Sequence, residues 1–119
     1  MAIVLIVDDD EMSLELAVTC MEIAGHSVLT ASNGANALQM AQRYRPDAVL
    51  LDMVLPDAGG LEVVDSLKAL DATKSIKIVM VSAEARKSFM DSAFAKGCDA
   101  YVVKPFHIDK LIASVEDVL

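Results

Sequence analysis

The residues of this chain that could do chemistry are carboxylates, a hydroxyl and an ammonium group, each placed directly after a run of apolar residues. Asp8-Asp9-Asp10 follow one such run, Asp52 follows another, and Ser82 and Lys104 follow two more. Carboxylates held close together repel one another, and a hard divalent cation with oxygen ligands relieves that repulsion. Mg²⁺ fits because it accepts one or two carboxylates, keeps several waters and shares a phosphate oxygen. One aspartate alone could equally cap a helix, but the whole set favours a binding site.

These groups can meet only if the apolar runs end at one place in the fold. β-Branched runs alternate with stretches of helical periodicity along the sequence. We expect strands at residues 3–7, 27–31, 47–51, 76–81 and 100–103. We expect one helix to follow the first strand up to residue 24, and the others at 33–44, 61–70, 86–96 and 108–119. Gly25 and Gly97 are expected to end the helices that precede them.

This alternation predicts an α/β fold, a doubly wound parallel sheet of five strands with helices on both faces. In such sheets the functional crevice lies beyond the carboxyl ends of the strands, where the strand order reverses. The first and third strands are neighbours there, so Asp9 and Asp52 should converge, with Asp8 close behind.

Length and composition exclude several classes of function. With 119 residues, the chain is expected to be one domain, residues 1–119. The net charge of -8 argues against DNA or RNA as a direct partner, because phosphate backbones select for clustered Lys and Arg. No apolar run approaches the roughly 20 residues of a membrane-spanning helix, and no basic segment precedes an apolar one at the N-terminus. We therefore expect no membrane partner and a soluble, cytoplasmic protein.

Five stretches, in this order and at this spacing, resemble the receiver domains of bacterial response regulators. They are residues 4–10 (VLIVDDD), 51–56 (LDMVLP), 60–62 (GLE), 79–83 (VMVSA) and 101–106 (YVVKPF). Each stretch is weak evidence alone, whereas the complete set is specific and spans essentially the whole chain. The resemblance implies a CheY-like, flavodoxin-like (βα)5 fold with strand order 2-1-3-4-5.

The resemblance also implies a role for each residue of the set. Asp52 would be the phospho-acceptor, receiving a phosphoryl group from a phosphohistidine on a sensor histidine kinase or a histidine phosphotransfer protein. Mg²⁺ would be bound by Asp9, by Asp8 through water, by Asp52 and by the backbone carbonyl of Val54. Lys104 would donate to the phosphoryl oxygens. Such a domain is no enzyme toward other substrates; it would catalyse only its own phosphotransfer and dephosphorylation.

In the resembled family, phosphorylation changes an output surface. Ser82 would donate its hydroxyl to the phosphate, and Tyr101 would fill the space that this movement vacates. The surface reshaped would consist of the fourth helix, the fifth strand and the last helix, and a downstream effector would bind there. The chain would act as a monomer or as a dimer promoted by phosphorylation. The lysine would be followed by a cis-proline, Pro105.

The first helix and the loop after the acceptor add two expectations. Asp10 is expected to open the first helix, where a carboxylate favours the positive end of the helix dipole. This helix has two apolar stripes, and we expect the first to pack on the sheet and the second to dock the kinase or phosphotransfer helices. The first stripe is Leu16, Ala17, Cys20, Ile23 and Ala24, and the second is Leu14, Val18 and Met21. In the loop, Ala58-Gly59-Gly60 departs from the family pattern, and its paired glycines make the backbone more permissive.

Two alternatives compete with this interpretation. A phosphatase of the haloacid dehalogenase type would use an Asp-x-Asp such as Asp8 and Asp10, but it needs more chain than exists here and leaves Asp52 unexplained. A degenerate receiver acting only as a binding module is the second, and the intact set of site residues argues against it.

Overall fold

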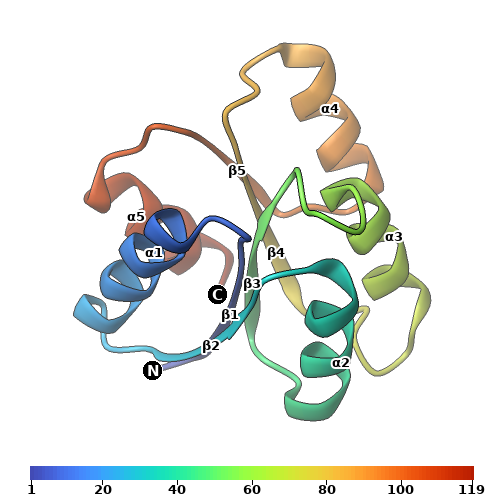
Figure 1. Cartoon of the computed structure of the whole chain (residues 1–119), viewed down its shortest axis with the longest axis horizontal. Coiled ribbons are helices and arrows are strands. Elements are labelled where there is room, and N and C mark those ends of the chain that lie inside the picture. Colours follow the sequence, from blue (N-terminus) through green and yellow to red (C-terminus); the bar gives the residue numbers. More distant parts are fainter.

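The computed structural model describes residues 1–119, in which five strands alternate with five helices (Figure 1). The strands are β1 (Ile3–Val7), β2 (Ser27–Ala31), β3 (Ala48–Asp52), β4 (Lys77–Ser82) and β5 (Ala100–Val103). The helices are α1 (Glu11–Ile23), α2 (Gly34–Tyr44), α3 (Gly60–Ala69), α4 (Lys87–Lys96) and α5 (Ile108–Val118). Every expected element is present, and β3 and β4 each lie one residue further along the chain than expected. None of the helices combines the length and apolar character that a membrane crossing requires.

The five strands form one parallel sheet in the order β2-β1-β3-β4-β5, which confirms the expected fold. β1 lies between β2 and β3, and its Val7 pairs with Ala31 on one side and with Leu51 on the other. The next residue of β3, Asp52, pairs with Val81 of β4. This register aligns the carboxyl ends of the strands at one edge of the sheet, where the candidate site residues lie.

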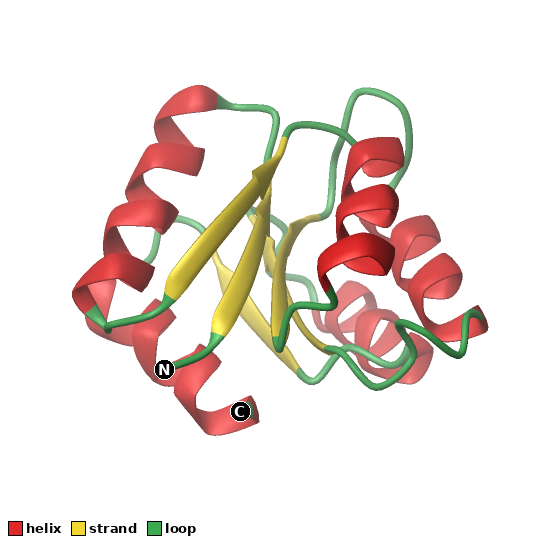
Figure 2. Ribbon diagram, turned by 90° about the horizontal axis from the view of Figure 1, so that it is seen from below, coloured by secondary structure: helices red, strands yellow, loops and turns green.

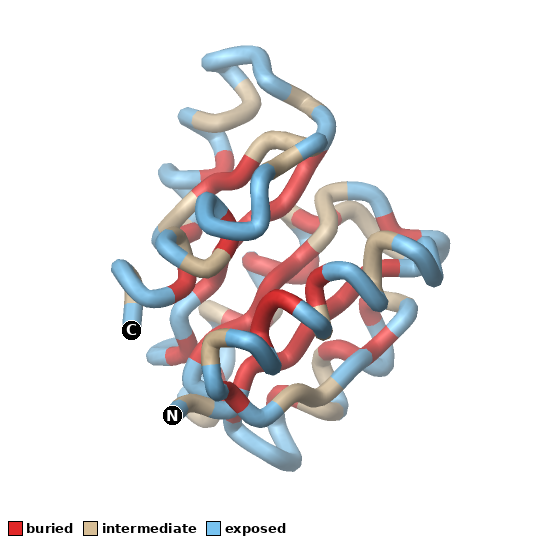
Figure 3. The backbone as a smooth tube through the Cα atoms, turned by 90° about the vertical axis from the view of Figure 1, so that its left-hand side faces the viewer, coloured by how far each residue is buried: buried red, intermediate tan, exposed pale blue.

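Helices cover both faces of the sheet, with α1 and α5 on one face and α2, α3 and α4 on the other (Figures 1 and 2). Successive residues of a strand point to opposite faces. Leu5 and Val7 therefore pack against α2, α3 and α4, whereas Val4 and Ile6 pack against α1 and α5. The strands form the buried centre of the molecule (Figure 3). Burial on both faces explains why the strands read as continuous apolar runs.

The face of α1 that packs on the sheet differs from the expected one. Leu16 and Ile23, expected against the sheet, are 45% and 66% exposed. Met21, expected on the outer stripe, is fully buried, and Leu14 and Val18 pack partly buried against the same core. The helix contacts α5 as well as the sheet, so it buries a wider arc than one stripe. Ala17 and Cys20 are buried against the sheet as expected, whereas the placement of Leu16, Ile23 and the second stripe was wrong.

The ends of the helices follow the sequence signals. Asp10 is the N-cap of α1, and its carboxylate accepts a hydrogen bond of 2.9 Å from the backbone N–H of Ser13. Gly25 follows the end of α1 with φ of 89°, and Gly97 ends α4 with φ of 115°. This left-handed conformation favours glycine because a side chain would crowd the backbone. Both expected helix ends are confirmed.

Candidate functional site

Three aspartates converge at the carboxyl edge of the sheet. Asp8 and Asp9 directly follow β1, and Asp52 is the last residue of β3. One carboxylate oxygen from each of the three lies within 4.8 Å of the others. Asp8 is buried, Asp52 is half-buried and Asp9 is exposed, so the cluster runs from the interior to the surface. The convergence expected from the strand order is confirmed.

Lys104 brings a positive charge to this cluster from the end of β5. Its Nζ donates a hydrogen bond of 3.1 Å to Asp8 Oδ2 and lies 3.7 Å from Asp52 Oδ2. The other oxygen of Asp8 accepts a hydrogen bond of 2.9 Å from the backbone N–H of Asp10, which fixes the orientation of the carboxylate. The peptide bond between Lys104 and Pro105 is cis, as the resemblance implied.

The environment of Asp52 disfavours its charge. Burial raises the pKa of Asp52 above its ordinary value, because a partly buried carboxylate loses hydration. The ammonium group of Lys104 and the backbone N–H of Val54 lower that pKa, while the nearby carboxylate of Asp8 raises it. The Val54 N–H donates to Asp52 Oδ1 over 3.3 Å. A carboxylate in these surroundings gains stability from an added cation.

An open depression of about 510 Å³ gives solvent access to this cluster. Its lining includes Asp52, Val54, Ser82, Glu84 and Lys104, which come from the last residues of β3 and β4 and from the loops that follow β3, β4 and β5. The side chain of Val54 is 72% exposed and leaves the way to the Asp52 carboxylate open. The carboxylate of Asp52 is therefore reachable from solvent through this depression.

Ser82 and Tyr101, the expected switch pair, are linked through one residue of the loop between β4 and α4. The backbone N–H of Glu84 donates a hydrogen bond of 3.0 Å to Ser82 Oγ. The hydroxyl of Tyr101 donates one of 2.7 Å to the backbone carbonyl of Glu84. Tyr101 is only 9% exposed, so its ring belongs to the core rather than to the surface. A movement of the Ser82 hydroxyl would break the first of these bonds.

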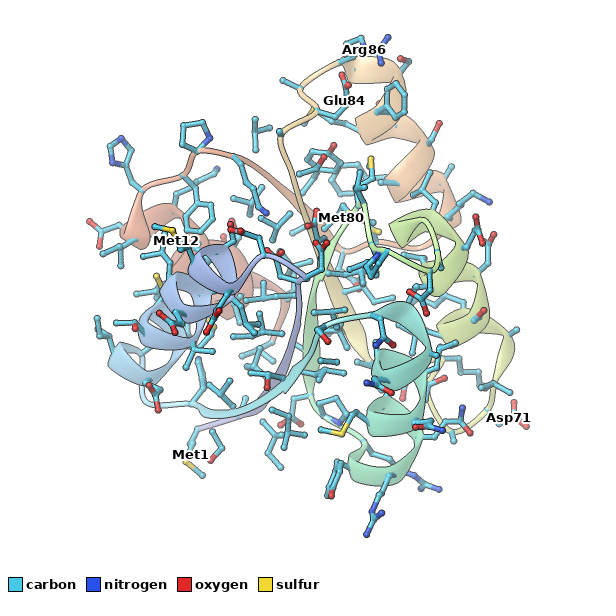
Figure 4. All side chains as sticks on the ribbon, in the orientation of Figure 1. Met1, Met12, Asp71, Met80, Glu84 and Arg86 are labelled. Atoms are coloured by element: carbon cyan, nitrogen blue, oxygen red, sulfur yellow. The ribbon has the colours of Figure 1, made fainter.

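The side chain of Glu84 makes a third connection in the same loop. Its carboxylate accepts hydrogen bonds of 2.7 and 3.2 Å from the Arg86 guanidinium, which lies 4.4 Å from the centre of the Phe89 ring. Hydrogen bonds with Arg86 hold the pKa of Glu84 below its ordinary value. Both side chains lie where the chain enters α4 (Figure 4). The sequence interpretation missed this pair, because Glu and Arg two residues apart usually indicate only a solvated turn.

The donor set at this edge fits Mg²⁺. The cluster consists of carboxylate oxygens alone, without the sulfur or imidazole groups that softer metals favour. Its two buried or half-buried members, Asp8 and Asp52, already share the charge of Lys104. A hard cation would complete the neutralisation of three adjacent carboxylates.

Comparison with known proteins agrees with this geometry. The model of the response regulator receiver domain family matches residues 4–116. The chain belongs to this family. Receiver domains act in two-component signalling, their partners are histidine kinases, and they are typically signalling domains rather than enzymes. The family assignment disfavours the phosphatase alternative.

Individual receivers resemble the whole chain. The polar-differentiation response regulator DivK of Brucella anthropi is 34% identical over 116 residues, which cover 98% of this chain and 94% of the relative. The crystal structure of the chemotaxis response regulator CheY4 of Vibrio cholerae superposes with a TM-score of 0.94 at 31% identity, covering 100% of this chain and 99% of that one. The crystal structure of a CheY-like receiver domain protein from Methanospirillum hungatei superposes with a TM-score of 0.90 at 26% identity. The match covers 98% of this chain and 92% of that one.

Proposed function

We propose that residues 1–119 form a single receiver domain that accepts a phosphoryl group on Asp52 in a Mg²⁺-dependent reaction. The donor is a phosphohistidine of a sensor histidine kinase or of a histidine phosphotransfer protein. One observation carries the proposal: the carboxylate of Asp52 faces an open depression while two further carboxylates and Lys104 surround it. The nucleophile, the groups that hold a cation and a donor for phosphoryl oxygens thus occur together.

In the proposed reaction, an oxygen of Asp52 attacks the phosphorus of the phosphohistidine. The bond between phosphorus and the imidazole nitrogen breaks, its electron pair stays on the imidazole, and an acyl phosphate forms on Asp52. Asp9, Asp52 and the Val54 carbonyl would hold Mg²⁺ directly and Asp8 through water, and the bound ion supplies charge neutralisation for the transferred group. The Lys104 ammonium group donates to a phosphoryl oxygen, which stabilises the charge that spreads over these oxygens.

The new phosphoryl group then acts on the β4–α4 loop. Phosphorylation adds about -1.5 to -2 charge at one point. The hydroxyl of Ser82 turns toward the phosphate and gives up its bond with the Glu84 backbone. The Glu84 carbonyl, which accepts the hydrogen bond of the Tyr101 hydroxyl, is then no longer held in place, and the Tyr101 ring repacks. This change alters the surface of α4, β5 and α5 for a downstream effector or for a second copy of the chain.

Intact mass after incubation with acetyl phosphate and Mg²⁺ tests the proposal. Wild type should gain one phosphoryl group, and the gain should disappear in Asp52→Asn and on removal of the metal. Asp10→Asn is the matched control, because this aspartate is adjacent to the cluster but caps α1. A gain that persists in Asp52→Asn would show that another residue is the acceptor. A folded wild type that takes no phosphoryl group from acetyl phosphate or from a phosphorylated kinase would establish the degenerate receiver instead.

A further inference from the structure

The loop that connects β3 to α3, residues 53–59, follows the proposed acceptor directly and is called the acceptor loop here. It folds back on itself: Val54 and Gly59 form an antiparallel bridge, and the Leu55 N–H donates to the Ala58 carbonyl over 3.2 Å. The Gly60 N–H closes the loop by donating to the Met53 carbonyl over 2.6 Å. The proposed backbone ligand of the metal, Val54, lies inside this folded segment.

Asp57, at the tip of the acceptor loop, is hydrogen-bonded to a different element. Its Oδ1 accepts from the backbone N–H of Gly34 over 2.7 Å, and its Oδ2 accepts from that of Ala35 over 3.0 Å. These are the first two residues of α2, and the third N–H, that of Asn36, is bonded to the side chain of Asn33. The carboxylate therefore satisfies the two amides that this helix leaves free and meets the positive end of its dipole.

The acceptor loop also packs closely against the first residue of α2. A Cβ atom added at Gly34 would lie 3.2 Å from the Cβ of Ala58 and 3.3 Å from Asp57 Oδ1. The start of α3 holds the loop through backbone alone: Gly60 packs against Asp52 and Met53, and the N-cap Gly59 has no side chain to bond with. The tie to α2 is therefore the side-chain attachment of this loop, in addition to the backbone contact at Gly60.

We propose that Asp57 is a positioning residue for the metal site. By fastening the tip of the acceptor loop to the N-terminus of α2, it holds the Val54 carbonyl where the cation needs a ligand. The inference rests on the proposed Mg²⁺ site and adds to it a residue that touches neither metal nor phosphate. Without the hydrogen bonds to α2, binding of the metal must also order the loop. The affinity of the site for Mg²⁺ then falls by the free energy that this ordering costs.

A Mg²⁺ titration followed by the amide NMR shifts of Asp9 and Met53 tests this role without phosphorylation. Asp57→Ala should raise the dissociation constant on the order of 10-fold, the lower end of what loss of a supporting group around a metal site causes. Asp57→Asn keeps one acceptor oxygen for Gly34 and should fall between Asp57→Ala and wild type. Glu62→Ala is the matched control, because it removes a carboxylate from the same surface depression without removing a bond to α2. It should bind Mg²⁺ like wild type.

Hydrogen exchange of the Gly34 and Ala35 amides, measured on the same samples, shows whether the tie is broken. Faster exchange in Asp57→Ala with an unchanged Mg²⁺ affinity would overturn the proposal. An equal loss of affinity in Glu62→Ala would also overturn it, because charge rather than loop position would then be the cause. A wild type that binds no Mg²⁺ would instead refute the metal site itself, and the proposed function with it.

Discussion

Lys104 is the only cationic side chain within 4.0 Å of the acidic cluster, where it pairs with Asp8 and Asp52. We expect Lys104→Ala to slow phosphorylation of Asp52 on the order of 100-fold, because the transferred phosphoryl group loses a preorganised donor. Mg²⁺ binding should survive, since the lysine is no metal ligand. The rate of mass gain with acetyl phosphate at saturating Mg²⁺ measures the effect.

The control for this variant is Lys77→Ala, which removes the same charge at the opposite end of β4. It should leave the rate unchanged. A rate in Lys104→Ala close to that of wild type would mean that the metal alone neutralises the phosphoryl oxygens.

Asp57 makes stability depend on pH in a defined direction. Hydrogen bonds from Gly34 and Ala35 hold the pKa of Asp57 below its ordinary value of 3.8. A carboxyl whose pKa is lowered by folding contributes stability above its unfolded pKa and loses it as the pH falls through the folded value. Asp57→Asn should therefore lower the free energy of unfolding near neutral pH, and the difference from wild type should shrink below about pH 4. Urea unfolding from pH 7 to pH 3 in a chelator checks this, and parallel curves would contradict it.

At the scale of the elements, two leucines of α1 differ in burial: Leu14 packs against the core, whereas Leu16 is exposed. Leu14→Glu places a charge against the core and should lower the free energy of unfolding by about 2 kcal/mol or more. Leu16→Glu, on the exposed side, should change it by only about 0.5 kcal/mol. Urea unfolding of both variants measures the difference, and equal effects would contradict the burial seen here.

Because Leu14, Val18 and Met21 pack against the core, a partner that docks on α1 must contact other apolar residues of this helix. The exposed apolar residues of α1 near the site are Met12 and Leu16, and Leu16 shares a depression of about 320 Å³ with Lys104 and Phe106. Met12→Glu/Leu16→Glu should slow phosphorylation by a kinase or phosphotransfer protein but not by acetyl phosphate. Unaltered phosphorylation by the protein donor would remove the hypothesis.

The sequence predicts the elements well and their faces less well. Strands buried on both sides give apolar runs that end at the site residues, so Asp8, Asp52 and Lys104 could be placed from sequence. The faces of α1 could not, because its apolar residues surround much of the helix and only the contact with α5 decides which are buried. Asp57 was missed for another reason. Its partners are backbone amides more than twenty residues away, and an aspartate after a proline gives no sign of them.

At the scale of the whole molecule, two cores share one sheet. Leu67 of α3 is buried in the core beneath α2, α3 and α4, and Leu111 of α5 is buried in the core on the other face. Each replacement by alanine should lower the free energy of unfolding by about 3 kcal/mol through lost contacts and a cavity. Both variants should still unfold in one transition, because every central strand contributes to both cores. Chemical unfolding followed by circular dichroism tests this, and two separate transitions in either variant would contradict it.

Both chain ends lie away from the proposed phosphorylation site. Met1 and Leu119 line a surface depression together with Asp47 and Lys77, which stand at the amino ends of β3 and β4. An affinity tag, a fluorophore or a sensor surface attached at either terminus would therefore leave the carboxyl edge free. Partner-binding measurements on an immobilised protein should give the same affinity whichever end carries the attachment.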